Sequence, residues 1–146
     1  MRRLRDDPEG AIAEFSRALA IKPRHAWVDN LRGVVRLENG DADGAIRDFD
    51  QAIASDPRNA EMHVNRGNAR NANGDRDGAV DDFSRALEIN PKDPIPHTNR
   101  GDLYRRKGDL GRAAKDFRKA LELAPLDWPH RGAVEEMLTK LEQDDR

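Results

Sequence analysis

Two histidines, His63 and His97, are the residues whose type and spacing first suggest chemistry in this sequence. The interval between them also separates Gly67 from Gly101, so they could stack on neighbouring elements of a repeating fold and hold a metal ion. A zinc site needs a third ligand and a carboxylate that orients its histidines, and the sequence places neither beside this pair. We therefore expect a packing role for both histidines, and we predict no metal site and no cofactor.

Adjacent carboxylates such as Asp81 and Asp82 are the next candidates, because paired acids can share general acid and base catalysis. On a helix, neighbouring side chains point about 100° apart, so these pairs do not converge on one substrate atom. The sequence also lacks the glycine-rich phosphate and dinucleotide loops and the serine-centred elbow of common enzymes. We predict that the chain is not an enzyme.

An arginine and an aspartate recur in step along the chain. The arginines are Arg32, Arg66 and Arg100, and the aspartates are Asp48, Asp82 and Asp116. An arginine can bury its aliphatic stem while its guanidinium binds a carboxylate through two parallel N–H groups. We expect a structural role for this set, in which each guanidinium reaches backbone carbonyls or the aspartate.

The same fixed period runs through the small, aromatic and proline positions. The recurring residues are Gly33, Gly67 and Gly101; Ala45, Ala79 and Ala113; Phe15, Phe49, Phe83 and Phe117; Ala18, Ala52, Ala86 and Ala120; and Pro23, Pro57, Pro91 and Pro125. Gly-Asp pairs recur at Gly40-Asp41, Gly74-Asp75 and Gly108-Asp109. A fixed period of this length is typical of a repeat architecture.

At these residues the sequence resembles the tetratricopeptide repeat (TPR) family. The motif of that family is about 34 residues long, with small residues where Gly67, Ala79 and Ala86 stand and an aromatic residue where Phe83 stands. The resemblance covers residues 7–127. It implies an all-α fold, a right-handed α-solenoid of antiparallel helix pairs, which binds other proteins in its concave groove.

The repeats predict one TPR domain over residues 1–146 with one helix pair per complete unit. Residues 1–25 form a partial repeat with only its second helix, at about 8–21; Met1 to Arg5 fall where a first helix should end. Complete repeats span 26–59, 60–93 and 94–127. The expected helices are 26–39, 42–55, 60–73, 76–89, 94–107 and 110–123, and a capping helix at about 129–143 lies within 128–146.

The recurring small residues predict how these helices pack. Gly40 can adopt the left-handed conformation that ends a helix, and Asp41 can cap the next one. Gly33 lies inside a helix, where glycine costs about 1 kcal/mol relative to alanine, so we expect close approach of the second helix there, with Ala45 making room. The phenylalanines should fill the space between successive units, and truncating one should cost roughly 3–5 kcal/mol.

The opposite face of each first helix predicts the binding surface. Its candidate residues are Trp27, Asn30, Leu31, Val34, Val64, Asn65, Asn68, Asn71, Asn99, Asp102, Arg105 and Arg106. The set grades from apolar, through amide-rich, to mixed basic. Asparagine amides both donate and accept hydrogen bonds and could hold a peptide backbone, while the arginines could bind an acidic residue or a terminal carboxylate.

One TPR subgroup grips chaperone tails with a carboxylate clamp of Lys, Asn, Asn, Lys and Arg spread over three first helices. Only Asn65 matches that pattern. The other places hold Asn30, Val34, Ile95 and Asn99. The resemblance therefore does not extend to chaperone-tail binding.

Composition narrows the class of partner. Lysine and arginine total 26, aspartate and glutamate total 28, and the two signs are mixed along the chain, which gives no basic stripe for nucleic acid. No apolar run reaches the roughly 20 residues that span a bilayer, and the start has no apolar centre of a signal peptide. We expect a soluble cytoplasmic protein whose partner is a protein or peptide.

Two alternatives to a peptide-binding scaffold stay open. The uncovered face of the partial repeat and the capping helix could mediate self-association into a homo-oligomer. The partial repeat at the start also suggests a regulatory fragment of a longer protein, with a missing helix upstream of Met1.

Overall fold

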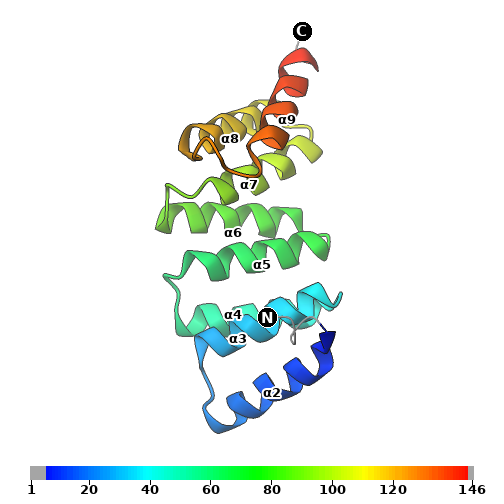
Figure 1. Ribbon diagram of the computed structural model, residues 1–146, viewed down its shortest axis with the longest axis vertical. Coiled ribbons are helices and arrows are strands. Elements are labelled where there is room, and N and C mark those ends of the chain that lie inside the picture. Colours follow the sequence, from blue (N-terminus) through cyan, green and yellow to red (C-terminus); the bar gives the residue numbers. More distant parts are fainter. Residues whose placement is uncertain (1–5, 145–146) are drawn as a thin grey trace. The chain divides into compact units, whose positions relative to one another are not determined.

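The computed structural model describes residues 6–144, which form helices α2–α9 and no strand (Figure 1). Met1 to Arg5, where the sequence predicts the end of a first helix, lie outside the described residues. The chain divides into two compact units, the first ending at Asp82 and the second beginning at Phe83. The boundary falls within a helix.

The helix bounds follow the predicted ranges closely. In the first unit they are α2 (Pro8–Ile21), α3 (Ala26–Glu38), α4 (Ala42–Ser55) and α5 (Ala60–Ala72). Helix α6 (Arg76–Ile89) contains the boundary. The second unit continues with α7 (Pro94–Arg106), α8 (Leu110–Leu123) and α9 (Arg131–Asp144).

The Gly-Asp pairs form the turns between the two helices of a repeat, as the sequence predicts. Gly40 has φ 86°, a left-handed conformation that glycine adopts without steric cost. The side chain of Asp41 then accepts a hydrogen bond from the backbone N–H of Gly44 at 2.9 Å, which caps α4. Gly74 and Gly108 repeat the conformation.

The core of the first unit is built around Phe49. In that unit, α2 packs on α3, α3 on α4 and α4 on α5, and α3 also contacts α5. Phe49 is fully buried and clusters with Ala45 and with Ala69 of the next repeat. A Cβ atom at Gly33 would lie 2.7 Å from the Phe49 ring. The glycine therefore makes room for the aromatic ring of Phe49, whereas the sequence pattern predicts Ala45 as the residue that faces it.

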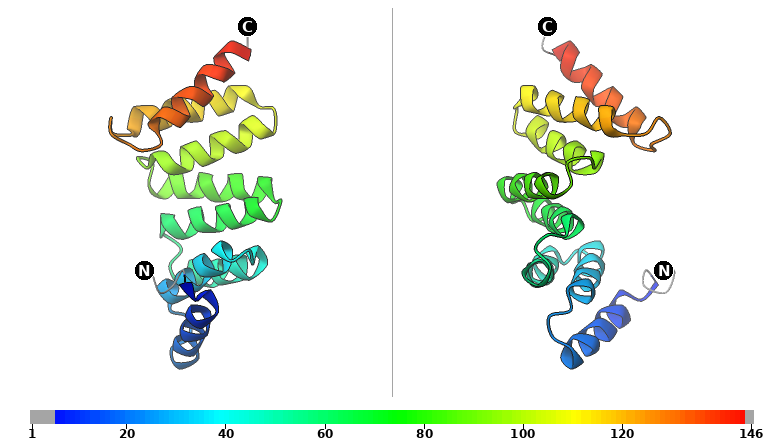
Figure 2. Two further views of the ribbon diagram at one scale, coloured as in Figure 1. Left: turned by 45° about the vertical axis from the view of Figure 1, so that its right-hand side comes forward. Right: turned by 90° about the vertical axis from the view of Figure 1, so that its left-hand side faces the viewer.

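The second unit repeats this packing and adds α9. A Cβ atom at Gly101 would lie 2.9 Å from the ring of Phe117, which is fully buried. Both views in Figure 2 show α9 (red) lying across α8, and Val134 and Leu141 bury themselves against Phe117. Helix α9 begins at Arg131 rather than at 129, because the first helical hydrogen bond runs from Val134 N–H to His130 O.

Candidate functional site

The predicted binding surface in the first unit lies on α3 and α5. Trp27 is 48% exposed, and Asn68 is exposed as well. The remaining members on these helices, apart from Asn30, are partly buried: Leu31, Val34, Val64, Asn65 and Asn71. Helices α3 and α5 contact each other, so Trp27 and the asparagines of α5 lie on neighbouring first helices.

Asn30 differs from its expected place on that surface. It is only 1% exposed, and its Oδ1 accepts a hydrogen bond from Asn65 Nδ2 at 3.0 Å. Its position three residues before Gly33 puts it on the packing side of α3, a spacing that could have revealed this from the sequence. Asn30 therefore orients Asn65 and is not itself open to a ligand.

The predicted residues of the second unit lie on α7. Asp102 pairs with Arg105 at 2.6 Å and with Arg106 at 3.0 Å, and both arginines are exposed. Asn99 is partly buried. Exposed pairs of this kind contribute little to stability, so an incoming acidic group can compete for the arginines.

The recurring arginines and aspartates form the buried ion pairs that the sequence predicts. Arg32 binds Asp48 through two N–H groups at 3.0 and 2.7 Å, and Arg36 adds a third bond at 2.8 Å. The side chain of Asp48 is 3% exposed. The next repeat has the same geometry at Asp82, which receives Arg66 and Arg70.

Each recurring arginine also bonds the second helix of the preceding repeat, a contact that the sequence analysis missed. Arg32 Nη1 donates to Ser16 at 3.1 Å, Arg66 Nη1 to Asp50 at 2.9 Å, and Arg100 Nη1 to Ser84 at 3.0 Å. The acceptors lie 16 residues before the arginine, and the aspartates lie 16 residues after it. The recurrence of Ser16, Asp50 and Ser84 at the repeat period was the available signal.

The two histidines occupy different environments. His63 is buried, with Nε2 3.0 Å from the carbonyl oxygen of Pro57 and with no hydrogen-bond partner for Nδ1 among the described residues. His97 Nδ1 lies 3.2 Å from Asp116 Oδ1, a carboxylate that the sequence analysis did not place beside it. Across residues 6–144, His, Asp and Glu form no cluster of three suited to a metal ion.

Asp116 shows the electrostatic balance of these ion pairs. Burial alone would raise the pKa of its carboxyl group, but hydrogen bonds from Arg100 and His97 outweigh burial, so this pKa lies below its usual value. The carboxylate therefore stays charged and contributes stability at neutral pH. That contribution is lost as the pH falls through the lowered pKa.

At Asp29 burial outweighs the nearby positive charges, so its pKa is shifted in the opposite direction to that of Asp116, and this leads to a pH-dependent prediction. It occupies the repeat position of His63 and is buried, with Arg32 only as near as 4.0 Å. Burial raises the pKa of its carboxyl group. Below the unfolded-state pKa the carboxyl group is protonated in both states, and its contribution to stability is fully present. This contribution is lost as the pH rises through the folded-state pKa, because the buried group then becomes charged. Asp29→Asn is thus expected to raise the melting temperature at pH 7.

The gain from Asp29→Asn should shrink toward pH 4, where the wild-type carboxyl is increasingly protonated. Thermal denaturation followed by circular dichroism at both pH values measures it. Glu38→Gln, which changes an exposed carboxylate on the same helix, should show no such difference. A variant less stable than wild type at pH 7 would contradict the assignment.

Comparison with models of protein families shows which family this sequence matches. One model described as Tetratricopeptide repeat matches residues 30–94, and a second with the same description matches residues 94–127. Together they span more than half of the chain. The chain belongs to the TPR family. The all-α, solenoid-like TPR fold predicted from the repeat period is confirmed.

Solved TPR structures resemble the chain over most of its length. A MamA crystal structure has 18% identity and a TM-score of 0.81, covering 99% of this chain and 92% of that one. SycD of Yersinia enterocolitica, in complex with a peptide of the translocator YopD, has 19% identity and a TM-score of 0.77, with coverage of 81% and 92%.

A third similar TPR structure is the first TPR of Spaghetti bound to the HSP90 peptide SRMEEVD. It has 25% identity and a TM-score of 0.74, with coverage of 82% of this chain and 91% of that one. Comparison with curated protein sequences gave no match. Within residues 6–144, none of the TPR helices combines the length and apolar character that crossing a membrane requires.

Helix α2 is less covered by its neighbours than α4 and α8 are. Phe15 is partly exposed, whereas Phe49 and Phe117 are fully buried. Ile21 at the end of α2 is 86% exposed. Self-association through this helix stays a prediction, as do the division of the chain into repeats and the capping role of α9.

Proposed function

We propose that this TPR chain is a non-enzymatic interaction module that holds a peptide segment of a partner protein along the first helices of its repeats. Similar TPR structures support a protein-interaction scaffold, since SycD and Spaghetti are each bound to a peptide. The observations that carry the proposal are the oriented amide of Asn65 on α5 and the exposed aromatic side chain of Trp27 on α3.

The amide of Asn65 is suited to a peptide backbone. Its Nδ2 donates a hydrogen bond to Asn30 Oδ1, which holds the amide in place. An asparagine amide can make up to about four hydrogen bonds, so one bond orients the group without exhausting it. An amide held in place loses less conformational entropy when a ligand binds.

The neighbouring side chains set the preference for the bound sequence. Trp27, with Leu31 and Val34 on the same helix, suits an apolar anchor residue. Arg105 and Arg106 suit an acidic residue or a chain-terminal carboxylate. The first unit therefore favours a segment with an apolar anchor residue, and the second unit favours a segment with an acidic residue or a free carboxyl end.

Selection from a displayed peptide library, followed by affinity measurement, tests the proposal. Peptides enriched on wild type should bind at least tenfold more weakly to Trp27→Ala and to Asn65→Ala/Asn99→Ala. The matched control is Asn39→Ala/Asn73→Ala, which changes exposed asparagines at the ends of α3 and α5 and should bind like wild type. If wild type and the Asn65→Ala/Asn99→Ala variant bound these peptides equally well, the proposed binding surface would be wrong.

A further inference from the structure

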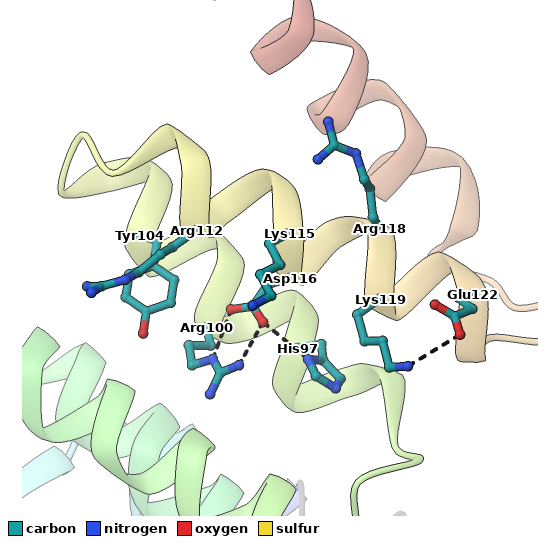
Figure 3. Close-up of a pocket in the computed structure, with 9 residues that line it drawn as sticks. All are labelled: His97, Arg100, Tyr104, Arg112, Lys115, Asp116, Arg118, Lys119 and Glu122. Carbon is teal, nitrogen blue, oxygen red and sulfur yellow. Dashed lines mark hydrogen bonds and ion pairs between the residues drawn. The ribbon is translucent and has the colours of Figure 1, made fainter.

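A pocket of about 560 Å³ opens between α7 and α8 in the second unit. From α7 it is lined by His97, Arg100 and Tyr104, a stripe distinct from the one that carries Asn99 and Asp102. Figure 3 shows α8 contributing a row of basic side chains to the other wall. The pocket is therefore separate from the proposed peptide surface on α7.

The pocket is strongly basic although the chain as a whole has a formal net charge of −2. Five lysine and arginine side chains line it, against two carboxylates. One of these, Asp116, is buried and receives both Arg100, at 2.8 Å to each oxygen, and His97. Its charge is thus already engaged inside the protein, and the open part of the pocket is left positive.

The cations on α8 are available to a ligand. Among residues 6–144, the carboxylates that pair with Arg112 and Lys119 are Asp109, which is partly exposed, at 3.4 Å and Glu122, which is exposed, at 3.3 Å; ion pairs at such open sites are weak. Lys115 has no ion pair among the described residues. The spacing of Arg112, Lys115 and Lys119 places them on one side of α8 over about 10 Å, given a rise of 1.5 Å per residue. A ligand that carries several negative charges in a row matches this arrangement.

Tyr104, the aromatic residue of the pocket, helps to decide whether the pocket suits a peptide or a nucleic acid. The guanidinium carbon of Arg112 lies 5.6 Å from the centre of the Tyr104 ring, and that of Arg100 lies 6.0 Å from it. Figure 3 shows Arg112 across the ring. Two guanidinium groups already lie over this ring and compete with a base for stacking on it, and base stacking supplies much of the affinity for single strands.

We propose that this pocket binds an acidic peptide segment of a partner protein, through carboxylates that contact Arg112, Lys115 and Lys119. This adds a second docking surface to the one on the first helices and does not depend on it. Both surfaces can act on one partner, whose acidic segment would then raise the rate of association by electrostatic attraction.

Fluorescence anisotropy with a labelled hexaglutamate peptide at 50 mM salt tests the proposal. Wild type should bind the peptide, and Lys115→Glu/Lys119→Glu should bind at least tenfold more weakly. Arg58→Glu/Arg76→Glu makes the same change in net charge at exposed sites in the first unit and should retain most of the binding. The Asn65→Ala/Asn99→Ala variant should bind like wild type, which separates this pocket from the proposed peptide surface.

Any one of four outcomes would overturn the proposal. Wild type fails to bind hexaglutamate, or the two charge-reversal variants lose affinity equally, or a single-stranded RNA of equal charge binds the pocket more tightly than the peptide. A hexaglutamine peptide of the same length is the probe control, and equal affinity for it would also contradict a carboxylate site. Amide chemical shifts in a titration should change on α7 and α8.

Discussion

Asp48→Ala is expected to lower the free energy of unfolding by about 3 kcal/mol. Asp48 is almost fully buried and binds the guanidinium groups of Arg32 and Arg36. Its removal leaves two cations short of their partner in a site largely closed to water, and breaking buried pairs in this way costs about 3–5 kcal/mol. We expect the lower end because both arginines keep some contact with water. Urea denaturation measures the loss.

Two variants separate the missing partner from a general loss of charge. Asp50→Ala removes an exposed acceptor of Arg66 and should cost no more than about 1 kcal/mol. Arg32→Met/Asp48→Leu removes the buried pair from both sides and should recover most of the stability that Asp48→Ala loses. If the double variant were less stable than Asp48→Ala, Arg32 would stabilise the fold through contacts other than Asp48, such as Ser16, and the explanation by an unpaired buried cation would be wrong.

Phe49→Ala should cost about 3–5 kcal/mol, because it opens a cavity between α3, α4 and α5. The ring is fully buried and fills the space above Gly33, which has no side chain to replace it. Ala45 and Ala69, on the other sides of the ring, are too short to reach into the gap.

Phe15→Ala is the matched comparison for Phe49→Ala. Phe15 stands at the same repeat position but is partly exposed, so truncation removes less buried surface and should cost no more than about half as much. Chemical denaturation of both variants gives the two values. Equal losses would mean that Phe15 is covered in solution, for example by a second copy of the chain.

Local chemistry explains why most of the fold could be predicted. Glycine at φ 86° and the capping aspartate after it end one helix and begin the next by short-range rules, and each further repeat applies the same rules again. The pairing of Arg32 with Asp48 could be predicted as well, since both recur in step. These features depend on a residue's own repeat.

The missed features depend on how neighbouring elements settle against each other. The burial of Asn30 follows from its spacing to Gly33, but its hydrogen bond joins it to Asn65, which comes from the next repeat. The contact of His97 with Asp116 joins positions 19 residues apart. The pocket between α7 and α8 results from the lengths and directions of several charged side chains, which no spacing rule encodes.

Each recurring arginine bonds one acceptor before it and one after it in the sequence. This arrangement affects how the chain could gain repeats in evolution. A tandem duplication of one unit brings a guanidinium, its own carboxylate and a new acceptor for the unit that follows. An inserted copy therefore leaves no buried charge stranded at either junction. The array can therefore gain or lose whole units in evolution while every junction between repeats keeps its arginine hydrogen bonds.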